Sequence, residues 1–276
     1  MKHISILSIF AVLLGISVQA QDTVSIISFN IRNSSAVAED GPHAWQYRKE
    51  AVVRMIRQEA PDIVGLQEAL PDQVAYLDSA LADTYSRYGV PRDDGKEKGE
   101  MMAVYYKSNR YGTIYTNTIW LSPTPQTPSV GWDGACKRTA SIVILKNLKS
   151  GHLFTYVNTH LDHVGKEARA EGLKLIANST AKNLATPVFV GGDFNTSMRD
   201  AIYSNLYQSG FKAARSDAPV TDNKMTYTGY GKSTPSTIDH IFYRKATPVS
   251  FQTLDANYGV PYISDHYPVK AIFVTK

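Results

Sequence analysis

The chain has 276 residues, of which 43% are hydrophobic and 20% are charged, and its formal net charge is +4. This balance is typical of a folded globular protein and excludes a disordered chain. The small net charge does not by itself identify a nucleic-acid-binding protein, although it leaves room for a local basic groove. No linker rich in glycine, serine, proline or one sign of charge divides the sequence, so we expect one domain.

The first twenty residues have the features of an export signal. Lys2 provides a positive start, residues 4–18 are mainly apolar, and small residues precede Gln21. This pattern predicts cleavage between Ala20 and Gln21, which leaves residues 21–276 as the exported domain, in the periplasm or outside the cell. The apolar stretch is shorter than the roughly 20 residues that span a bilayer, so no transmembrane anchor is expected.

Strands and helices alternate along the chain, with more strands than helices. The segment 45–59 shows how helices are recognised, because Trp45, Val52 and Ile56 recur at helical spacing and Pro61 ends the pattern. Strand predictions rest on short runs rich in β-branched residues. In chain order we expect a strand over 23–30, helix 45–59, strand 63–67, helix 72–81, strands 102–106, 113–121, 140–146 and 153–159, helix 165–184, strand 188–191, helix 201–209, and strands 238–243 and 269–274.

Several of these strands follow one another directly. A single parallel sheet would require a crossover between successive strands, whereas neighbouring strands are typical of antiparallel pairs. The order therefore predicts two sheets packed on each other with helices outside.

Polar residues follow the apolar part of six predicted strands or loops. Loops at strand ends are where folds of this kind place binding and catalytic groups. One such cluster alone is an ordinary cap or turn, but six together indicate a site. The blocks are Phe29-Asn30, Leu66-Gln67-Glu68, Asn158-Thr159-His160, Gly191-Gly192-Asp193-Phe194-Asn195, Ile238-Asp239-His240 and Ser264-Asp265-His266.

These six blocks resemble those of the endonuclease/exonuclease/phosphatase superfamily. They occur in the order of that superfamily and span nearly all of residues 21–276, and GGDFN together with SDHYP is the most specific part. The resemblance implies an α/β fold with a four-layer sandwich, in which two packed mixed β-sheets are flanked by helices. It also implies a phosphoesterase that uses a metal ion.

For the metal, the resemblance implies that Glu68 is the principal ligand, with Asn30 beside it and Asp265 close to the same cation. Hard oxygen ligands with few fixed protein bonds suit Mg²⁺, and Mn²⁺ suits the same set. Zinc would prefer His or Cys ligands at closer spacing, and no HxxxH or CxxC motif is present in the sequence.

For the chemistry, the resemblance implies that Asp193 and Asn195 align the attacking water. His266 would contact the scissile phosphate, Asp239 would hold its ring, and His160 would be a second histidine on the phosphate. The physics of the reaction agrees, because an anionic phosphoester needs charge neutralisation and an aligned water more than a covalent nucleophile.

Two further residues are candidates for substrate binding. Arg138 precedes a predicted strand and has the geometry to bind a phosphate through two hydrogen bonds. Tyr230, with Tyr227 nearby, is placed to stack on a base or a sugar. A surface role for Arg138 and a core or rim role for the tyrosines remain alternatives.

Other charged or polar residues are expected to have lesser roles. Residues 92–100, RDDGKEKGE, are expected to form a solvated loop, with Glu100 a candidate to orient Arg138. His240 is expected at the surface, on the face of its strand opposite Asp239. The only cysteine, Cys136, excludes an internal disulfide and is expected in the core or in a loop. Asp162 is expected either to line the site or to cap the following helix.

Taken together, the sequence predicts a secreted Mg²⁺-dependent phosphoesterase that uses metal-assisted in-line attack of water on a phosphodiester or phosphomonoester. Its substrate is left open among nucleic acid, nucleotides, sugar phosphates and lipid head groups. The stretch ending at Asp239-His240 lacks the block typical of inositol 5-phosphatases. The alternative is an inactive binding protein with the same fold, which the complete set of catalytic residue types disfavours.

Overall fold

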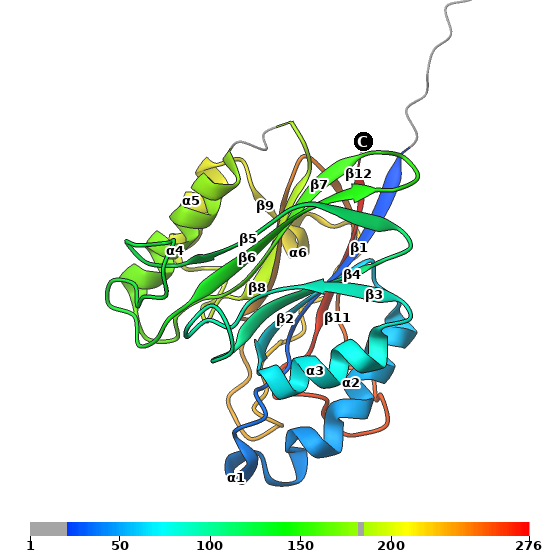
Figure 1. The fold of residues 1–276 in the computed structure, drawn as a ribbon, viewed down its shortest axis with the longest axis vertical. Coiled ribbons are helices and arrows are strands. Elements are labelled where there is room, and N and C mark those ends of the chain that lie inside the picture. Colours follow the sequence, from blue (N-terminus) through cyan, green and yellow to red (C-terminus); the bar gives the residue numbers. More distant parts are fainter. Residues whose placement is uncertain (1–20, 182–184, 276) are drawn as a thin grey trace, which may run out of the picture.

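The computed structural model describes residues 21–181 and 185–275. The expected export signal, residues 1–20, lies outside these ranges. Two six-stranded sheets pack face to face, and helices cover their outer faces (Figure 1). The predicted four-layer α/β sandwich is therefore confirmed. Within the described residues, no helix is long and apolar enough to cross a membrane.

The first sheet is mixed and has the strand order β11-β12-β1-β2-β4-β3. Helices α2 (Trp45–Glu59) and α3 (Pro71–Leu81) cover its outer face (Figure 1). Val52 of α2 and Leu77 of α3 are fully buried against Ile27 and Phe29 of β1. The strands are β1 (Asp22–Asn30), β2 (Ile63–Ala69), β3 (Tyr85–Tyr88), β4 (Met101–Lys107), β11 (Thr247–Thr253) and β12 (Val269–Thr275), and two short elements, α1 (Val37–Asp40) and the 3₁₀-helix Gly41–His43, follow β1.

The second sheet has the order β5-β6-β7-β8-β10-β9. Helices α4 (Lys166–Ser179) and α5 (Ser204–Gln208) lie on its outer face, where Leu173 and Ile176 pack against Val157 and Val190. Its strands are β5 (Tyr111–Trp120), β6 (Thr139–Asn147), β7 (Leu153–His160), β8 (Val188–Asp193), β9 (Lys212–Ala213) and β10 (Asp239–Arg244), and the short elements Ala201–Tyr203 and α6 (Ala214–Asp217) complete this half.

The inner faces of the two sheets form a third hydrophobic cluster. Along β1 the side chains alternate, so Val24 and Ile26 face the other sheet while Ile27 and Phe29 face the helices. Tyr156 lies across this interface. A Cβ at Gly191 of the same sheet would be 2.6 Å from the Tyr156 hydroxyl and 3.3 Å from Ser28 Cβ of the first sheet, so a glycine is required there.

Strand direction places the polar blocks together. Strands β1 and β2 are parallel, and so are β7 and β8, so their carboxyl ends lie at one edge of each sheet. The two edges meet across the interface, where the Asn30 side-chain amide donates to Asp193 Oδ2 at 3.0 Å. Blocks 163 residues apart in sequence thus meet at one place.

The secondary structure differs from the prediction in several places. The helix expected over 165–184 ends at Ser179, where the Thr180 hydroxyl donates to the carbonyls of Ile176 and Ala177, and residues 182–184 of the prediction lie outside the described ranges. Strands β3, β9 and β11 and the short helices α1 and α6 were not predicted. Strand β11 lies at a sheet edge, has a bulge between Pro248 and Ser250, and is largely solvent-facing, so it lacks a run of apolar residues.

Candidate active site

A cavity of about 700 Å³ opens where the strand ends of the two sheets meet. Of the predicted site residues, Asn30 and Asp239 are fully buried behind its wall, and Tyr230 lies apart from it. The lining residues are Arg32, Asn33, Glu68, Arg92, Glu100, Cys136, Arg138, His160, His163, Asp193, Asn195, Tyr227, Ser236, Ile238, Asp265 and His266.

Glu68 is held by two neighbouring asparagines. Its Oε1 accepts from Asn30 Nδ2 at 2.9 Å, and its Oε2 accepts from the Asn33 side-chain amide at 2.9 Å and main-chain N–H at 3.1 Å. Burial opposes ionisation, but the Asn30 hydrogen bond and the charge of His266 lower the pKa of Glu68 below its usual value. The carboxylate is therefore charged and fixed in orientation.

Asp265 provides a second carboxylate close to Glu68. Its Oδ1 accepts from Ser264 Oγ at 3.0 Å, and its Oδ2 lies 4.0 Å from Arg32 Nε. Burial raises the pKa of Asp265, and the negative charge of Glu68 adds to the effect. Two like charges with oxygen donors thus face one region, and a bound cation would relieve their repulsion.

Asp193 lies at the centre of the site. Its Oδ1 accepts from the Asn195 main-chain N–H at 2.9 Å, while its Oδ2 lies 3.5 Å from His160 Nε2 and 3.7 Å from His266 Nε2. Burial and the charge of neighbouring Asp239 raise the pKa of Asp193 to about 7. A carboxyl group with this pKa is suited to exchange a proton near neutral pH.

His266 is oriented by Asp239. Its Nδ1 is bonded to Asp239 Oδ2 at 2.9 Å, and both side chains are almost fully buried. Burial disfavours the imidazolium, but the carboxylate of Asp239 outweighs it and raises the pKa of His266 well above its usual value. The ring therefore presents a charged Nε2–H toward Asp193 and the cavity.

His160 has the opposite electrostatic environment. Its Nε2 lies 3.0 Å from Asn195 Nδ2, which also donates to the Leu161 carbonyl at 2.9 Å. Burial and the positive charges of Arg138 and Arg92 lower the pKa of His160 well below its usual value. This histidine is therefore neutral at pH 7.

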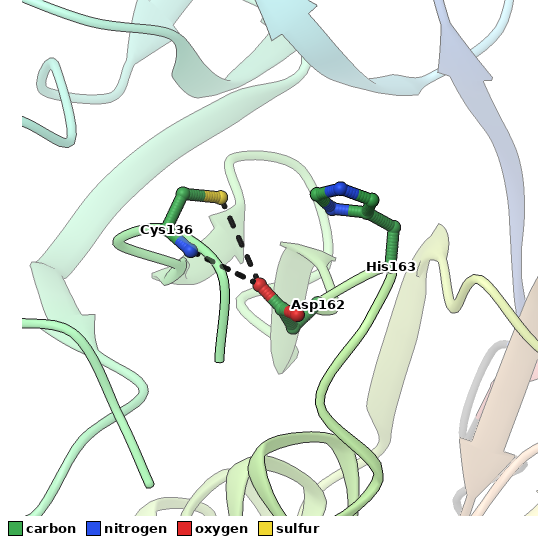
Figure 2. Close-up of side chains that lie close together, drawn as sticks. All are labelled: Cys136, Asp162 and His163. Carbon is green, nitrogen blue, oxygen red and sulfur yellow. Dashed lines mark hydrogen bonds between the residues drawn. The ribbon is translucent and has the colours of Figure 1, made fainter. Parts of the chain in front are cut away.

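Two groups of described residues have the donor atoms to hold a metal ion. In each group the donor atoms lie within 4.8 Å of one another. The buried group is Asp193, Asp239 and His266, although the bond from His266 Nδ1 to Asp239 already uses two of its donors. The other group is Cys136, Asp162 and His163 (Figure 2). The site as a whole thus has a buried acidic and histidine cluster that could bind a metal.

The two predicted substrate contacts differ in position. Arg138 lines the cavity, where its Nε lies 3.5 Å from Asp162 and its Nη2 lies 3.0 Å from His163 Nδ1. Tyr230 instead donates to Asp40 at 3.1 Å and stacks on His43, so Tyr227 is the tyrosine that lines the cavity.

Other predicted roles are corrected. Glu100 accepts from Arg92 at 2.5 Å and makes no hydrogen bond to Arg138. His240 does point away from the dyad, but it is 2% exposed, and its Nε2 bonds the Thr196 carbonyl at 3.1 Å. The surface position expected for His240 is therefore wrong. Asp162 contacts the cavity loop, and its Oδ1 accepts from the Gly165 N–H at 2.8 Å in the turn before α4, whereas the first N–H groups of the helix donate to Asp133.

Three cavity residues were missed in the sequence. Arg32 and Asn33 follow Asn30 by two and three positions, and this closeness to a recognised block was a usable signal. Arg92 belongs to the loop expected to be solvated, and nothing in its local sequence distinguishes it from a surface arginine.

Comparisons with known proteins agree with this geometry. A model of the endonuclease/exonuclease/phosphatase family matches residues 27–266. The solved endonuclease/exonuclease/phosphatase of Bacteroides vulgatus is 33% identical, with a TM-score of 0.87 over 92% of this chain and 100% of that one. The mannosyl-6-phosphatase of Bacteroides thetaiotaomicron is 30% identical, with a TM-score of 0.84 over 91% and 99% of the two chains.

A curated relative is more distant. The CCR4-Not complex 3'-5'-exoribonuclease subunit Ccr4 of Mycosarcoma maydis is 22% identical over 93% of this chain, but the match spans only 51% of that protein. The family match, the two solved structures and the buried cluster of carboxylate and imidazole groups agree with one another. The chain therefore belongs to the endonuclease/exonuclease/phosphatase family of phosphoesterases.

Proposed function

We propose that the chain is an exported, Mg²⁺-dependent phosphatase that acts on small, hydrophilic phosphomonoesters, with sugar phosphates as the substrate class. The observation that carries this proposal is the arrangement of Asp239, His266 and Asp193. A charged imidazole, held from behind at 2.9 Å, points its second nitrogen to within 3.7 Å of the central carboxylate. A cation and a proton acceptor thus face the same small volume, as in-line attack of water on phosphorus requires.

Each catalytic side chain has one task in this scheme. Asp193 accepts a hydrogen bond from the attacking water and receives its proton. Asn195 holds that carboxylate through its main-chain N–H. His266 donates to a non-bridging phosphate oxygen, where negative charge is neutralised in the transition state, and Asp239 keeps the ring charged. His160, being neutral, donates or accepts a hydrogen bond without adding charge.

Glu68 and Asp265 are the residues that fit a divalent cation. Both offer carboxylate oxygens, Glu68 is kept ionised, and the burial of Asp265 beside it leaves an electrostatic cost that a cation removes. Asn30 orients Glu68 and lies next to this pair. Oxygen donors suit Mg²⁺, with Mn²⁺ as a substitute. When bound, the ion would supply charge neutralisation at the phosphate.

The cavity lining supports a small polar substrate. Of the sixteen described residues that line it, only Tyr227 and Ile238 have large hydrocarbon side chains, and the other rings are the imidazoles of three histidines. A lipid tail would require an apolar wall, and single-stranded nucleic acid would require several stacking rings. A sugar phosphate requires neither, and the 30% identical solved neighbour is named a mannosyl-6-phosphatase.

A substrate panel tests the proposal. Purified protein with Mg²⁺ or Mn²⁺ is assayed for phosphate release from mannose 6-phosphate, glucose 6-phosphate and p-nitrophenyl phosphate. Bis-p-nitrophenyl phosphate, RNA and plasmid DNA serve as diester substrates. We expect kcat/KM for at least one sugar phosphate to exceed that for every diester by at least about tenfold, a difference of about 1.4 kcal/mol. A preference for a diester would overturn the substrate class while leaving the phosphoesterase assignment intact.

Export is tested separately. When the chain is expressed with residues 1–20, mass spectrometry of the protein outside the cytoplasm should find Gln21 at or near its N-terminus. Intact residues 1–20 on cytoplasmic protein would contradict export.

If no phosphoester in the substrate panel is turned over, the inactive binding protein with the same fold becomes the better-supported function.

A further inference from the structure

Two arginines and one histidine near His160 line the cavity but have no task in the scheme above. They are Arg92, Arg138 and His163, and we call them the basic arm. All three affect His160, since Arg138, Arg92 and His163 each help to lower its pKa after burial. The basic arm is thus close to the catalytic centre.

Arg92 is fixed in place by its loop. Its main-chain N–H donates to the Glu100 carbonyl at 2.9 Å, and its own carbonyl accepts from Trp120 Nε1 at 2.7 Å. Its Nη1 donates to Glu100 Oε2 at 2.5 Å, whereas Nε and Nη2 have no hydrogen-bond partner among the described residues. The loop therefore holds a guanidinium at the cavity wall with donor capacity left over.

Arg138 is also fixed by a carboxylate, that of Asp162. Asp162, which anchors it at Nε, is itself fixed by the main-chain N–H groups of Ala135 and Gly165. Nη2 of Arg138 contacts His163 Nδ1 at 3.0 Å. Because the arginine contacts both Asp162 and His163, its positive charge already occupies the region between them. The Cys136, Asp162 and His163 group in Figure 2 is therefore a poor metal site.

His160 separates the basic arm from the reacting groups. Its Nε2 faces Asn195 and Asp193, at 3.0 Å and 3.5 Å. Its Nδ1, on the other edge of the ring, faces Glu100 at 4.0 Å and has no hydrogen-bond partner in the described structure, although the side chain is only 6% exposed. Arg92, bonded to Glu100, thus lies on the side of the ring away from Asp193.

We propose that the basic arm binds a second anionic group of the substrate, so that the preferred substrate is a small phosphoester with a further phosphate. This deepens the function proposed above and depends on it for the identity of the reaction. Guanidinium groups that are fixed by carboxylates behind them bind tetrahedral oxyanions well, because their donors are already oriented. A sugar bisphosphate has this chemistry. A polynucleotide also has repeated phosphates, but Tyr227 is the only Tyr, Trp or Phe among the described residues of the cavity wall, so successive bases lack a stacking surface.

The kinetic test compares two substrates that differ in one phosphate. We measure kcat/KM for release of the first phosphate from fructose 1,6-bisphosphate and from fructose 6-phosphate. Arg92→Met should reduce kcat/KM for both substrates by different factors. The factor for the bisphosphate should be at least about ten times the factor for the monophosphate, which is the effect of one charge-assisted hydrogen bond. Arg92→Lys, which keeps the charge, should recover part of the difference.

Arg87→Met is the matched control. Arg87 also pairs with a carboxylate, Asp78 at 2.9 Å, but it does not line the cavity, so both substrates should be unaffected. Equal losses on both substrates in Arg92→Met would place Arg92 at the scissile phosphate and overturn the proposal. A larger loss on a short oligonucleotide than on the bisphosphate would overturn it as well, in favour of nucleic acid.

A second test needs no turnover. Cys136 is the only cysteine of the chain, is half-buried and lines the cavity beside the basic arm. Its thiolate attacks the S–S bond of an aromatic disulfide, which forms a mixed disulfide and releases one aromatic thiolate. We compare the dianionic reagent 5,5'-dithiobis(2-nitrobenzoic acid) with the neutral 4,4'-dithiodipyridine, and Cys136→Ser shows that the signal arises at this residue.

Inorganic phosphate should slow the labelling of Cys136 by the anionic reagent by at least about threefold. It should slow labelling by the neutral reagent less. Arg92→Met should weaken the protection that phosphate gives against the anionic reagent. Equal rates with and without phosphate for both reagents would overturn the basic arm as an anion site. Protection without turnover of any phosphoester would instead keep the anion site and reject the proposed reaction, so the two failures are distinguishable.

Discussion

At the scale of single residues, the two histidines of the site differ in charge because their neighbours differ. His266 lies between Asp239 and Asp193, and its pKa is raised despite burial. His160 is buried, and burial together with the positive charges of Arg138 and Arg92 lowers its pKa. The same residue type therefore serves as a fixed cation in one position and as a neutral hydrogen-bonding group in the other.

The dyad of His266 and Asp239 predicts coupled losses of activity. His266→Ala should lower kcat by at least about a hundredfold, on the scale of one oxyanion donor. Asp239→Asn should also lower kcat strongly, because the ring loses the carboxylate that keeps it charged. The double variant should lose less than the product of the single losses, since both residues act through one contact.

The control for this cycle is His152, whose ring contacts Asp22 at 3.0 Å, at the end of β1 opposite Asn30. His152→Ala should leave kcat unchanged. His240 is unsuitable as a control, because its burial against Phe194 and Phe242 means that removal would lower stability. Strictly multiplicative losses for His266 and Asp239 would show that they do not form a dyad.

The pKa values predict a bell-shaped dependence of kcat/KM on pH. Asp193 has a raised pKa of about 7, so it becomes protonated and unable to take a proton as the pH falls below about 7. His266 has a pKa well above its usual value, so its positive charge is lost only on the alkaline side. Rates between pH 5 and 10 at saturating Mg²⁺ test this, and a rate that rises as the pH falls from 7 to 5 would contradict it.

Residue identities in the six blocks were readable from the sequence, but their partners were not. Asn30, Asp193 and His266 were singled out because amide, carboxylate and imidazole groups follow apolar runs. The contact of Glu100 with Arg92 depends on how a loop folds back, which local sequence does not determine. The choice between Tyr227 and Tyr230 depends on a tight turn in which Tyr230 itself has φ +58°.

At the scale of secondary-structure elements, two site residues at strand ends have unusual backbone conformations. Glu68 and Asn195 have φ values of +62° and +51°, in the left-handed region that non-glycine residues seldom adopt. Both follow a predicted strand and both line the cavity. Such conformations persist where surrounding contacts fix them, and they explain why the strand pattern alone does not give the direction of these side chains.

The helix 45–59 was predicted with its observed bounds, because Pro61 marks its end in the sequence. In the structure the helix ends at Glu59, and Ala60 after it adopts the left-handed conformation. The helix beginning near 165 was predicted too long, because the sequence has no glycine or proline near 180 to mark its end. The capping bonds of Thr180 that end it are a property of the folded chain.

The close packing of Tyr156 of β7 over Gly191 of β8 predicts a stability effect. Gly191→Ala should lower the free energy of unfolding by about 1–3 kcal/mol, because the new methyl group overlaps the buried Tyr156 hydroxyl. Gly112→Ala is the matched control in β5, where the methyl group meets only the exposed Leu148 side chain at 3.3 Å. Urea denaturation of both variants is the measurement, and equal midpoints would contradict the packing argument.

At the scale of the whole molecule, the site exists only because two sheets face each other. Glu68 and Asn30 belong to the first sheet, whereas Asp193, His160 and Asp239 belong to the second (Figure 1). The hydrogen bond from Asn30 to Asp193 joins the two halves. The surplus of strands predicted such packing in general terms, but the cavity and the basic arm depend on the pairing of distant segments, which a single sequence does not specify.

The central claim is that Glu68 and Asp265 hold a cation that the catalytic groups around Asp193 need. Phosphate release is measured on protein treated with EDTA and then titrated with Mg²⁺, for the wild type and for Glu68→Gln, which keeps shape but removes charge. We predict no release without metal, full recovery in the wild type, and at least about tenfold more Mg²⁺ for half-maximal rate in the variant. Full activity after complete chelation, or the same Mg²⁺ requirement in Glu68→Gln, would contradict the claim.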